Sequence, residues 1–328
     1  MKRVVLYNPR AHFFDMPLAL LAIASGLDPE RFEVEIIDAR LESDPHARLV
    51  AAARGAVCVG MTVLTGRPIV DALEAAERVR AVHPEVPIVW GGWHASLFPT
   101  AVLEEESAVD ITVQGQGEET FRVLVDHLAE GAPLDGLEGI SYRREGVPIK
   151  NPPRAMVDLN ALPPVRYDWI DCRRYFEKKG RRQLDFISST GCLFRCTFCA
   201  DPHVYQRRFT QLSPDRLVAT LRTLQAQTGF EDLNFQDETF FTYPKDALEM
   251  AKGLMDAGVR TTWAATLRAD QCHRMSDSDL ALLRRSGLRR VLMGVESGSQ
   301  EMMDRLKKDI RMSHVLEGAA RCKQLGIS

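Results

Sequence analysis

The chain has 328 residues, of which 45% are hydrophobic and 27% are charged, and its formal net charge is −3. This length predicts two domains, each large enough to bury a core. The small net charge does not favour a polyanionic partner, and basic pairs such as Lys307-Lys308 are expected on solvated faces. No secretory leader opens the chain and no apolar run reaches the roughly 18 residues of a membrane span, so we expect a cytoplasmic protein.

Residues 1–135 alternate short apolar runs with helical patterns, which is typical of a parallel sheet covered by helices. The predicted strands are residues 3–8, 33–38, 56–62, 87–92 and 110–115. Pro17 is expected to open the first helix and Gly26 to close it. In an open α/β sheet, ligands bind beyond the carboxyl ends of the strands.

Glycines gather at those predicted strand ends, at Gly91-Gly92 and at Gly115 and Gly117. A backbone without side chains can approach a bulky ligand closely, and the N–H groups of the following helix can bind polar groups. The alternative is that both glycine pairs only form tight turns.

Residues 136–184 are expected to form a hairpin and a linker. The hairpin covers residues 140–149 and turns at Glu145-Gly146, and proline-rich stretches follow it. The aromatic residues of this region could line a cleft between the domains or anchor the linker to a core: Tyr167, Trp169, Tyr175 and Phe176.

Residues 185–328 show a second alternation of strands and helices. Strands are predicted at 184–188, 232–236, 262–267 and 290–294, with helices near 213–229, 244–257, 277–286 and 313–325. We expect a partial parallel barrel that stops after its fourth β-α unit, so that the chain is a fragment or is completed by something else. Polar residues follow three of the strands, on the rim where barrel active sites lie: Gln236, Asp237, Glu238, Thr266, Arg268, Glu296, Ser297 and Gly298.

Cys192, Cys196 and Cys199 are spaced C-x3-C-x2-C and follow the first strand of this domain. Three thiols in one loop can bind a metal centre and leave one position open to an outside ligand. The other four cysteines show no pairing pattern. The alternative is a non-catalytic zinc scaffold in which His203 supplies a fourth ligand.

The first domain resembles the cobalamin-binding domain of corrinoid proteins, whose motif is D-x-H-x-x-G, then S-x-L, then G-G. Thr62-Val63-Leu64 stands in the S-x-L place and Gly91-Gly92 follows at a suitable interval, but Pro17 stands where the family has its cobalt-ligating histidine. His12 and His94 are possible substitutes, although a lone loop histidine is more often a polar surface residue. The resemblance implies that the following residues bind cobalamin: Thr62, Val63, Leu64, Gly91, Gly92, Gly115, Gln116, Gly117 and Glu118.

The cysteine spacing, with Phe198 before the last cysteine, resembles the signature of radical SAM enzymes, and the segment 294–299 matches that family's fourth strand. The whole chain resembles their cobalamin-dependent class: a Rossmann-like (flavodoxin-like) cobalamin domain followed by a partial radical SAM barrel. The resemblance implies that the three cysteines hold a [4Fe-4S] cluster whose open iron binds S-adenosylmethionine. It assigns six residues to that ligand: Phe198 to adenine, Glu238 or Asp237 to the amino group, Glu296 to the ribose, Arg268 to the carboxylate, and Ser297 as a further contact.

The implied reaction is reductive cleavage of S-adenosylmethionine to a 5′-deoxyadenosyl radical, hydrogen abstraction from an unactivated carbon, and methylation from methylcobalamin. The implied partners are a small-molecule substrate and an electron donor such as flavodoxin or ferredoxin. Two alternatives stay open: radical ring formation or rearrangement without methyl transfer, and a first domain that holds no corrinoid.

Overall fold

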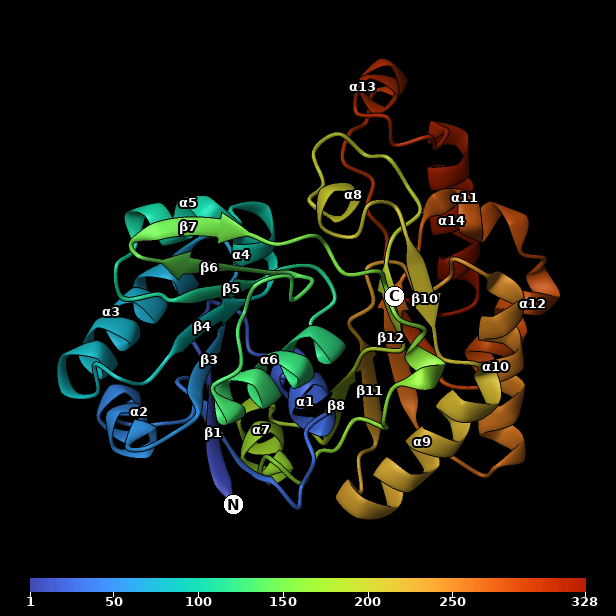
Figure 1. Cartoon of the computed structure of the whole chain (residues 1–328). Helices are drawn as coiled ribbons and strands as arrows, with labels where there is room; N and C mark the ends of the chain where they lie inside the picture. The colour runs from blue at the N-terminus through green and yellow to red at the C-terminus, as the bar shows by residue number, and fades with distance from the viewer. The chain divides into compact units, whose positions relative to one another are not determined.

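The computed structural model describes residues 1–328, and the chain divides into two compact units (Figure 1). The first unit contains Met1–Val157 and Leu162–Asp171, and the second contains Asp158–Ala161 and Cys172–Ser328. None of the helices combines the length and the apolar character that a membrane span needs.

The first unit is built on a seven-stranded sheet with the order β2-β1-β3-β4-β5-β6-β7. Its strands are β1 (Lys2–Asn8), β2 (Phe32–Asp38), β3 (Cys58–Thr62), β4 (Ile88–Gly91), β5 (Ile111–Val113), β6 (Ile140–Arg144) and β7 (Val147–Lys150). The first five strands are parallel, in the flavodoxin-like order 2-1-3-4-5, and the last two are antiparallel. The predicted α/β class and all five parallel strands are confirmed.

Helices cover both faces of this sheet because each parallel strand carries apolar residues on both sides. The helices are α1 (Leu18–Ser25), α2 (Pro45–Ala53), α3 (Arg67–Val82), α4 (Trp93–Leu97), α5 (Pro99–Glu105) and α6 (Glu118–Glu130). In β1, Val5 joins the core beneath α2, α3 and α5, while Val4 joins the core beneath α1 and α6. Helix α1 begins directly after Pro17 and ends at Gly26, as predicted.

The predicted hairpin forms as the β6–β7 pair and extends the sheet of the first unit. Glu145 and Gly146 both have positive φ, at 50° and 83°, which is the backbone that a tight two-residue hairpin turn requires. In the linker that follows, Trp169 packs against the core beneath α1 and α6. Tyr175, in α7 (Cys172–Lys179) of the second unit, is fully buried. These aromatic residues therefore anchor the linker to the cores.

The second unit contains four parallel strands in the order β13-β12-β11-β8. They are β8 (Gln183–Phe186), β11 (Asp232–Phe235), β12 (Thr262–Thr266) and β13 (Leu288–Leu292), with α9 (Pro214–Thr228), α10 (Pro244–Asp256), α12 (Asp277–Arg285) and α14 (Met312–Gln324) as the main helices. All four predicted strands and helices are confirmed, although β13 begins two residues before the predicted start. The aromatic side chains of Phe235, Phe240 and Trp263 contact one another in the core.

Several short elements of this unit carry no signal in the sequence. They are η1 (Leu159–Ala161), β9 (Ser189–Gly191), α8 (Asp201–Val204), β10 (Phe209–Gln211), α11 (Ala269–Arg274) and α13 (Gln300–Arg305). Strands of three residues and helices of six are too short to show a period. At the outer edge of β13, Ser328 donates its N–H to the Arg289 carbonyl, and Val291 donates to the Ser328 carbonyl.

We expect Ser276→Ala to destabilise the second unit by about 1 kcal/mol, because Ser276 caps α12. Its Oγ accepts from the Asp279 N–H at 3.2 Å, and its own N–H donates to the Asp279 carboxylate at 2.9 Å. Ser213→Ala is the matched control, since Ser213 stands at the same position of α9 but its side chain makes no capping bond. Urea unfolding compares the two variants, and equal losses would contradict the capping argument.

Candidate active site

The cysteine loop connects two short antiparallel strands at the carboxyl edge of the four-stranded sheet. It leaves β9 at Gly191, whose φ of 89° suits glycine, and it returns through α8 to β10. Cys196 is 8% exposed, whereas Cys192 and Cys199 are half-buried. Burial raises the pKa of the Cys192 thiol and raises that of Cys199 to about 11. These thiols therefore stay protonated at neutral pH until a metal displaces the protons.

The three thiols of the loop are a donor set that fits an iron–sulfur cluster. Besides burial, the charge of Cys196 contributes to the raised pKa of Cys192, and the charge of Cys192 contributes to that of Cys199. The thiols are therefore close enough to interact electrostatically. No three Cys, His, Asp or Glu side chains converge as ligands of one ion would. Three thiolates are the soft ligands that hold a four-iron cluster and leave one iron open, so the donor set of the loop fits such a cluster. The zinc alternative with His203 finds no preformed site here.

A distant segment, residues 306–309, is docked on the cysteine loop. The Thr197 N–H donates to the Leu306 carbonyl at 3.0 Å, and Arg195 forms a two-pronged ion pair with Asp309 at 2.8 and 3.0 Å. Lys308 is only 7% exposed, so the expectation that it lies on a solvated face is wrong. Its ion pair with Glu296, at 2.8 Å, offsets the cost of burying the charge. Sequence reasoning missed this segment because more than a hundred residues separate it from the loop it contacts.

The residues that the resemblance assigns to adenine and ribose lie near this docked segment. Glu296 has a φ of 64°, a left-handed backbone that a non-glycine residue rarely adopts, and it pairs with Lys308. The Lys308 Nζ also lies 5.6 Å from the centre of the Phe198 ring, which is half exposed. Ser297 accepts the Ser299 N–H through its hydroxyl at 3.1 Å. Glu296 and Phe198 are thus brought together through Lys308, while Ser297 lies in the adjoining turn.

Asp237, at the carboxyl end of β11, is bound into the protein on one side. Its Oδ1 accepts the Ser188 N–H at 3.0 Å, the Ser188 hydroxyl at 2.8 Å and the Ser189 hydroxyl at 2.5 Å. Its Oδ2 is buried without a partner. Burial raises the pKa of Asp237 to about 6, against the hydrogen bonds from Ser189 and Ser188, which lower it. This carboxylate ties the start of the cysteine loop to the neighbouring strand.

Glu238 and Asp201 are carboxylates with buried oxygens that no group of the protein binds. The Glu238 Oε2 and the Asp201 Oδ1 are both buried and unpaired. Burial raises the pKa of Glu238 to about 8, and the nearby Asp201 carboxylate adds to the increase. Burial also raises the pKa of Asp201, whose other oxygen accepts the Cys199 thiol at 3.5 Å. Two unsatisfied carboxylates beside the cysteine loop indicate a place for a cationic or hydrogen-donating ligand. The short α8 that positions Asp201 gave no sequence signal.

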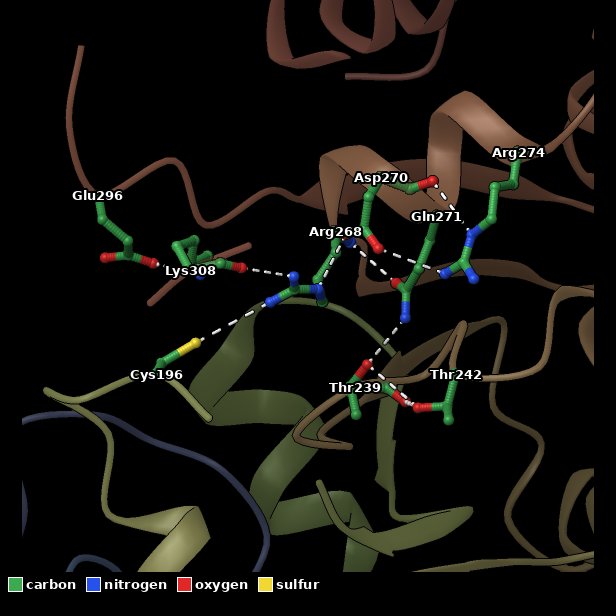
Figure 2. Close-up of polar contacts among 9 residues, drawn as sticks. All are labelled: Cys196, Thr239, Thr242, Arg268, Asp270, Gln271, Arg274, Glu296 and Lys308. Atoms are coloured by element: carbon green, nitrogen blue, oxygen red, sulfur yellow. Dashed lines mark hydrogen bonds and ion pairs between the residues drawn. The ribbon is translucent and has the colours of Figure 1, made fainter. Parts of the chain in front are cut away.

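Thr266 ends β12 and Arg268 follows it on the same rim. Thr266 donates its hydroxyl to the Asp237 carbonyl at 3.0 Å and accepts the Phe240 N–H, so it holds the loop after β11 against the end of β12. Figure 2 shows the Arg268 guanidinium directed toward Cys196, with Lys308 and Asp270 on other sides. Its predicted role toward the carboxylate of S-adenosylmethionine stays a prediction.

In the first unit, the predicted cobalamin residues meet at the carboxyl edge of the sheet. A Cβ on Gly92, whose φ is 86°, would lie 3.0 Å from the Val63 carbonyl oxygen and 3.1 Å from Thr62 Oγ1. The Val63 N–H donates to the Gly91 carbonyl at 2.9 Å. Thr62, Leu64, Gly91 and Gly92 are each only partly buried. Glycine therefore lets the ends of β3 and β4 touch and still leaves their backbone accessible.

Ser96 connects the third strand end to this pair. Its hydroxyl donates to the Gly92 carbonyl at 2.7 Å and accepts the Gly115 N–H at 3.0 Å. Gln116 is held by both atoms of its amide, which bind the backbone of Val157. Gly117 caps α6 and Glu118 is its first residue, with a pKa raised by burial. The structure thus brings all nine predicted residues to one edge of the sheet, an arrangement that suits a large planar ligand.

The position of the family's cobalt-ligating histidine offers no imidazole. Pro17 is buried and directly precedes α1, and His12 is exposed in the preceding loop. The Nδ1 of His94 lies 3.2 Å from the Thr65 hydroxyl, and burial lowers its pKa.

Two family models match the chain. The model described as "B12 binding domain" matches residues 11–125, and the model described as "Radical SAM superfamily" matches residues 186–328.

Curated relatives align over almost the whole chain. An uncharacterized methyltransferase of Pyrococcus horikoshii is 27% identical over 95% of this chain and 67% of its own length. The cytidylyl-2-hydroxyethylphosphonate methyltransferase of Streptomyces wedmorensis is 26% identical over 97% of this chain and 70% of its own. The anaerobic magnesium-protoporphyrin IX monomethyl ester cyclase of Synechocystis is 26% identical over 95% of this chain and 62% of its own.

Solved structures show the same fold. The cobalamin-dependent S-adenosylmethionine radical enzyme OxsB superposes with a TM-score of 0.85 at 22% identity, over 100% of this chain and 48% of that chain. The methyltransferase TsrM of Kitasatospora setae superposes with a TM-score of 0.83 at 21% identity, over 100% of this chain and 66% of that one. This chain therefore spans between half and two thirds of the length of these structures.

The two units are thus a B12-binding domain and a radical SAM domain, the domain pair of enzymes that use a corrinoid together with an iron–sulfur cluster. The chain belongs to the cobalamin-dependent radical SAM enzymes, whose members among its relatives are methyltransferases and cyclases. This membership implies three cofactors: a [4Fe-4S] cluster, S-adenosylmethionine and cobalamin.

We expect Gly92→Ala to abolish cobalamin retention and to lower stability more than Gly131→Ala does. The backbone of Gly92 (φ 86°, ψ −168°) lies in a region that only glycine adopts readily, and its Cβ would meet the Val63 backbone. Gly131 is the matched control, because its φ of 66° is also positive but nothing lies within 4 Å of an added Cβ. Gel filtration with cobalamin followed by absorbance measures retention, and a Gly92 variant that keeps cobalamin would contradict the assignment.

We expect Glu238→Gln to stabilise the cofactor-free protein at pH 8 by about 1 to 3 kcal/mol, because it removes a buried carboxylate that has one oxygen without a partner. The folded-state pKa of about 8 lies above the ordinary value of 4.5, so the folded protein holds a proton that the unfolded chain has lost. Wild-type stability should therefore fall as the pH rises from about 4.5 to 8, and the variant should lose this component. Urea unfolding across this range tests it, with the exposed Glu301→Gln as the control that should match the wild type.

Proposed function

We propose that this chain methylates an unactivated carbon of a small-molecule substrate. When bound, the cluster, S-adenosylmethionine and methylcobalamin supply the electron, the 5′-deoxyadenosyl radical and the methyl group. The observation that carries the proposal is the three-cysteine loop flanked by two carboxylates, Glu238 and Asp201, that each have one buried oxygen without a partner. Relatives named as methyltransferases align over 95% and 97% of the chain, which favours methylation.

In this proposal the second unit binds and orients S-adenosylmethionine. Cys192, Cys196 and Cys199 hold the cluster and leave one iron for the amino and carboxylate groups of the ligand. Glu238 accepts a hydrogen bond from the amino group through Oε2, which lacks a partner within the protein. Asp237 also has one unpartnered oxygen, Oδ2, but its Oδ1 is committed to Ser188 and Ser189. Glu296 is available to the ribose hydroxyls through the oxygen that Lys308 does not bind.

The first unit holds cobalamin at the edge formed by the ends of β3, β4 and β5. Their partly exposed backbone, kept open by Gly92, can lie against the corrin ring. Pro17 has no nitrogen that could bind cobalt, so this position would not supply the imidazole that the family's histidine offers.

A cyclase of the same architecture is the second candidate, favoured by the Synechocystis relative that aligns over 95% of the chain. Both candidates need a low-potential electron donor such as flavodoxin or ferredoxin. They differ in one product, because only methylation consumes a second S-adenosylmethionine to regenerate methylcobalamin.

We expect the anaerobically reconstituted protein to form both S-adenosylhomocysteine and 5′-deoxyadenosine when given S-adenosylmethionine, cobalamin and a chemical reductant. Liquid chromatography with mass detection measures the two products. The variant Cys192→Ala should lose the cluster iron and the 5′-deoxyadenosine that depends on it, while Cys172→Ala, which lies outside the loop, should retain both. 5′-Deoxyadenosine alone favours the cyclase, and a fully loaded protein that forms neither product would overturn the proposal.

A further inference from the structure

Arg268 stands between the sheet and the cysteine loop, at a position fixed by the fold. It is the last residue before α11, and its N–H donates to the Gln271 side chain at 3.0 Å. Gln271 in turn donates to the Thr239 hydroxyl at 3.1 Å, which joins the start of α11 to the loop after β11 (Figure 2). The backbone of Arg268 is therefore fixed between the end of β12, which it follows, and the loop after β11, which Gln271 contacts.

The guanidinium is held from three sides. Its Nε donates to Asp270 Oδ1 at 2.9 Å, and its Nη2 donates to the Lys308 carbonyl at 2.7 Å. The Phe194 ring lies below it, with the ring centre 3.5 Å from the guanidinium carbon. Arg268 is only 8% exposed. A planar group held by two hydrogen bonds and a ring has one orientation.

That orientation directs the remaining nitrogen at a thiol of the cysteine loop. Nη1 lies 4.0 Å from the Sγ of Cys196, at the long end of the range for an N–H···S contact (Figure 2). Cys196 is the most buried of the three cysteines. The neighbouring cations are engaged elsewhere, since Arg195 pairs with Asp309 and Lys308 with Glu296.

We propose that Arg268 is a positioning residue that presents a positive charge and an N–H donor to the Cys196 sulfur, and that it thereby raises the reduction potential of the cluster. This inference rests on the proposed function, in which Cys196 is a cluster ligand. Hydrogen bonds to the sulfurs and the net charge around a cluster set its potential. One-electron reduction adds a negative charge to the cluster, and a buried guanidinium stabilises that charge more than an exposed one would.

A substitution of Asp270 should change the reduction potential in the opposite direction to a substitution of Arg268. Its Oδ1 binds the Arg268 Nε, and its Oδ2 binds Arg274 at 3.3 Å, so it offsets part of the guanidinium charge. Asp270→Asn removes that offset, while the Lys308 carbonyl and the Phe194 ring still hold Arg268 in place. The structure therefore offers one variant that should lower the potential and another that should raise it.

The experiment is a redox titration of the reconstituted protein, without S-adenosylmethionine or cobalamin, followed by electron paramagnetic resonance of the reduced cluster. We expect Arg268→Gln to shift the midpoint potential to more negative values. Arg268→Lys should shift it less, because it keeps the charge but loses the planar donor. Asp270→Asn should shift it to more positive values.

Arg274→Gln is the matched control, because Arg274 lies on the same helix and binds the same Asp270 but has a 55% exposed side chain. Its potential should stay close to that of the wild type. An Arg268→Gln protein with a full iron content and the wild-type potential would overturn the inference, as would an equal shift in the Arg274 variant.

Iron content separates this role from a purely structural one. If Arg268→Gln retains no cluster, Arg268→Lys and Asp270→Asn decide the question: shifts of opposite sign support the inference, and wild-type potentials in both overturn it. Because the titration contains no S-adenosylmethionine, a failure of methyl transfer would leave this result unaffected. The two proposals can therefore fail separately.

Discussion

The architecture of the radical SAM unit depends on the carboxylate of Asp237. One of its oxygens accepts three hydrogen bonds from Ser188 and Ser189, the two residues that lead from β8 into the cysteine loop. This interaction joins the first and second strands of the parallel sheet at their carboxyl ends, where the loop departs. Without it, the residues that lead into the loop would lose three hydrogen bonds to the neighbouring strand end. A buried carboxylate is costly to desolvate, and the three donors offset that cost.

The fold could be predicted from the sequence because the long elements bury regular patterns. Nine parallel strands appear as apolar runs. The structure confirms each of them, and the predicted and observed strand ends differ by no more than about two residues. Gly26, Ser276 and Gly146 marked helix ends and a turn through local chemistry that needs no tertiary contact. The β9–β10 pair and α11 could not be predicted, since elements of three and six residues have no period to detect.

The site residues could be predicted only where a short stretch of sequence indicates their chemistry by itself. Three thiols in nine residues and glycines at strand ends do so. Lys308 does not: its sequence context, Lys307-Lys308-Asp309, is that of a solvated turn, and its burial arises from Glu296 and from the contact of residues 306–309 with the loop. Asp201 is another such case, because only the folded α8 places its carboxylate beside Glu238. Roles that depend on contacts between distant segments require the structure.

Negative and positive side chains lie at different places around the cysteine loop. This arrangement fits the two groups that the loop is proposed to bring together, the cluster and S-adenosylmethionine. Glu238 and Asp201 carry buried oxygens without partners, whereas Arg268 places a compensated positive charge against Cys196. An ammonium group would satisfy the carboxylates, and a reduced cluster would be stabilised by the guanidinium. In the proposed arrangement, these charges would therefore meet partners of opposite sign. The buried polar groups that cost stability in the protein alone are the ones that would bind and orient its cofactors.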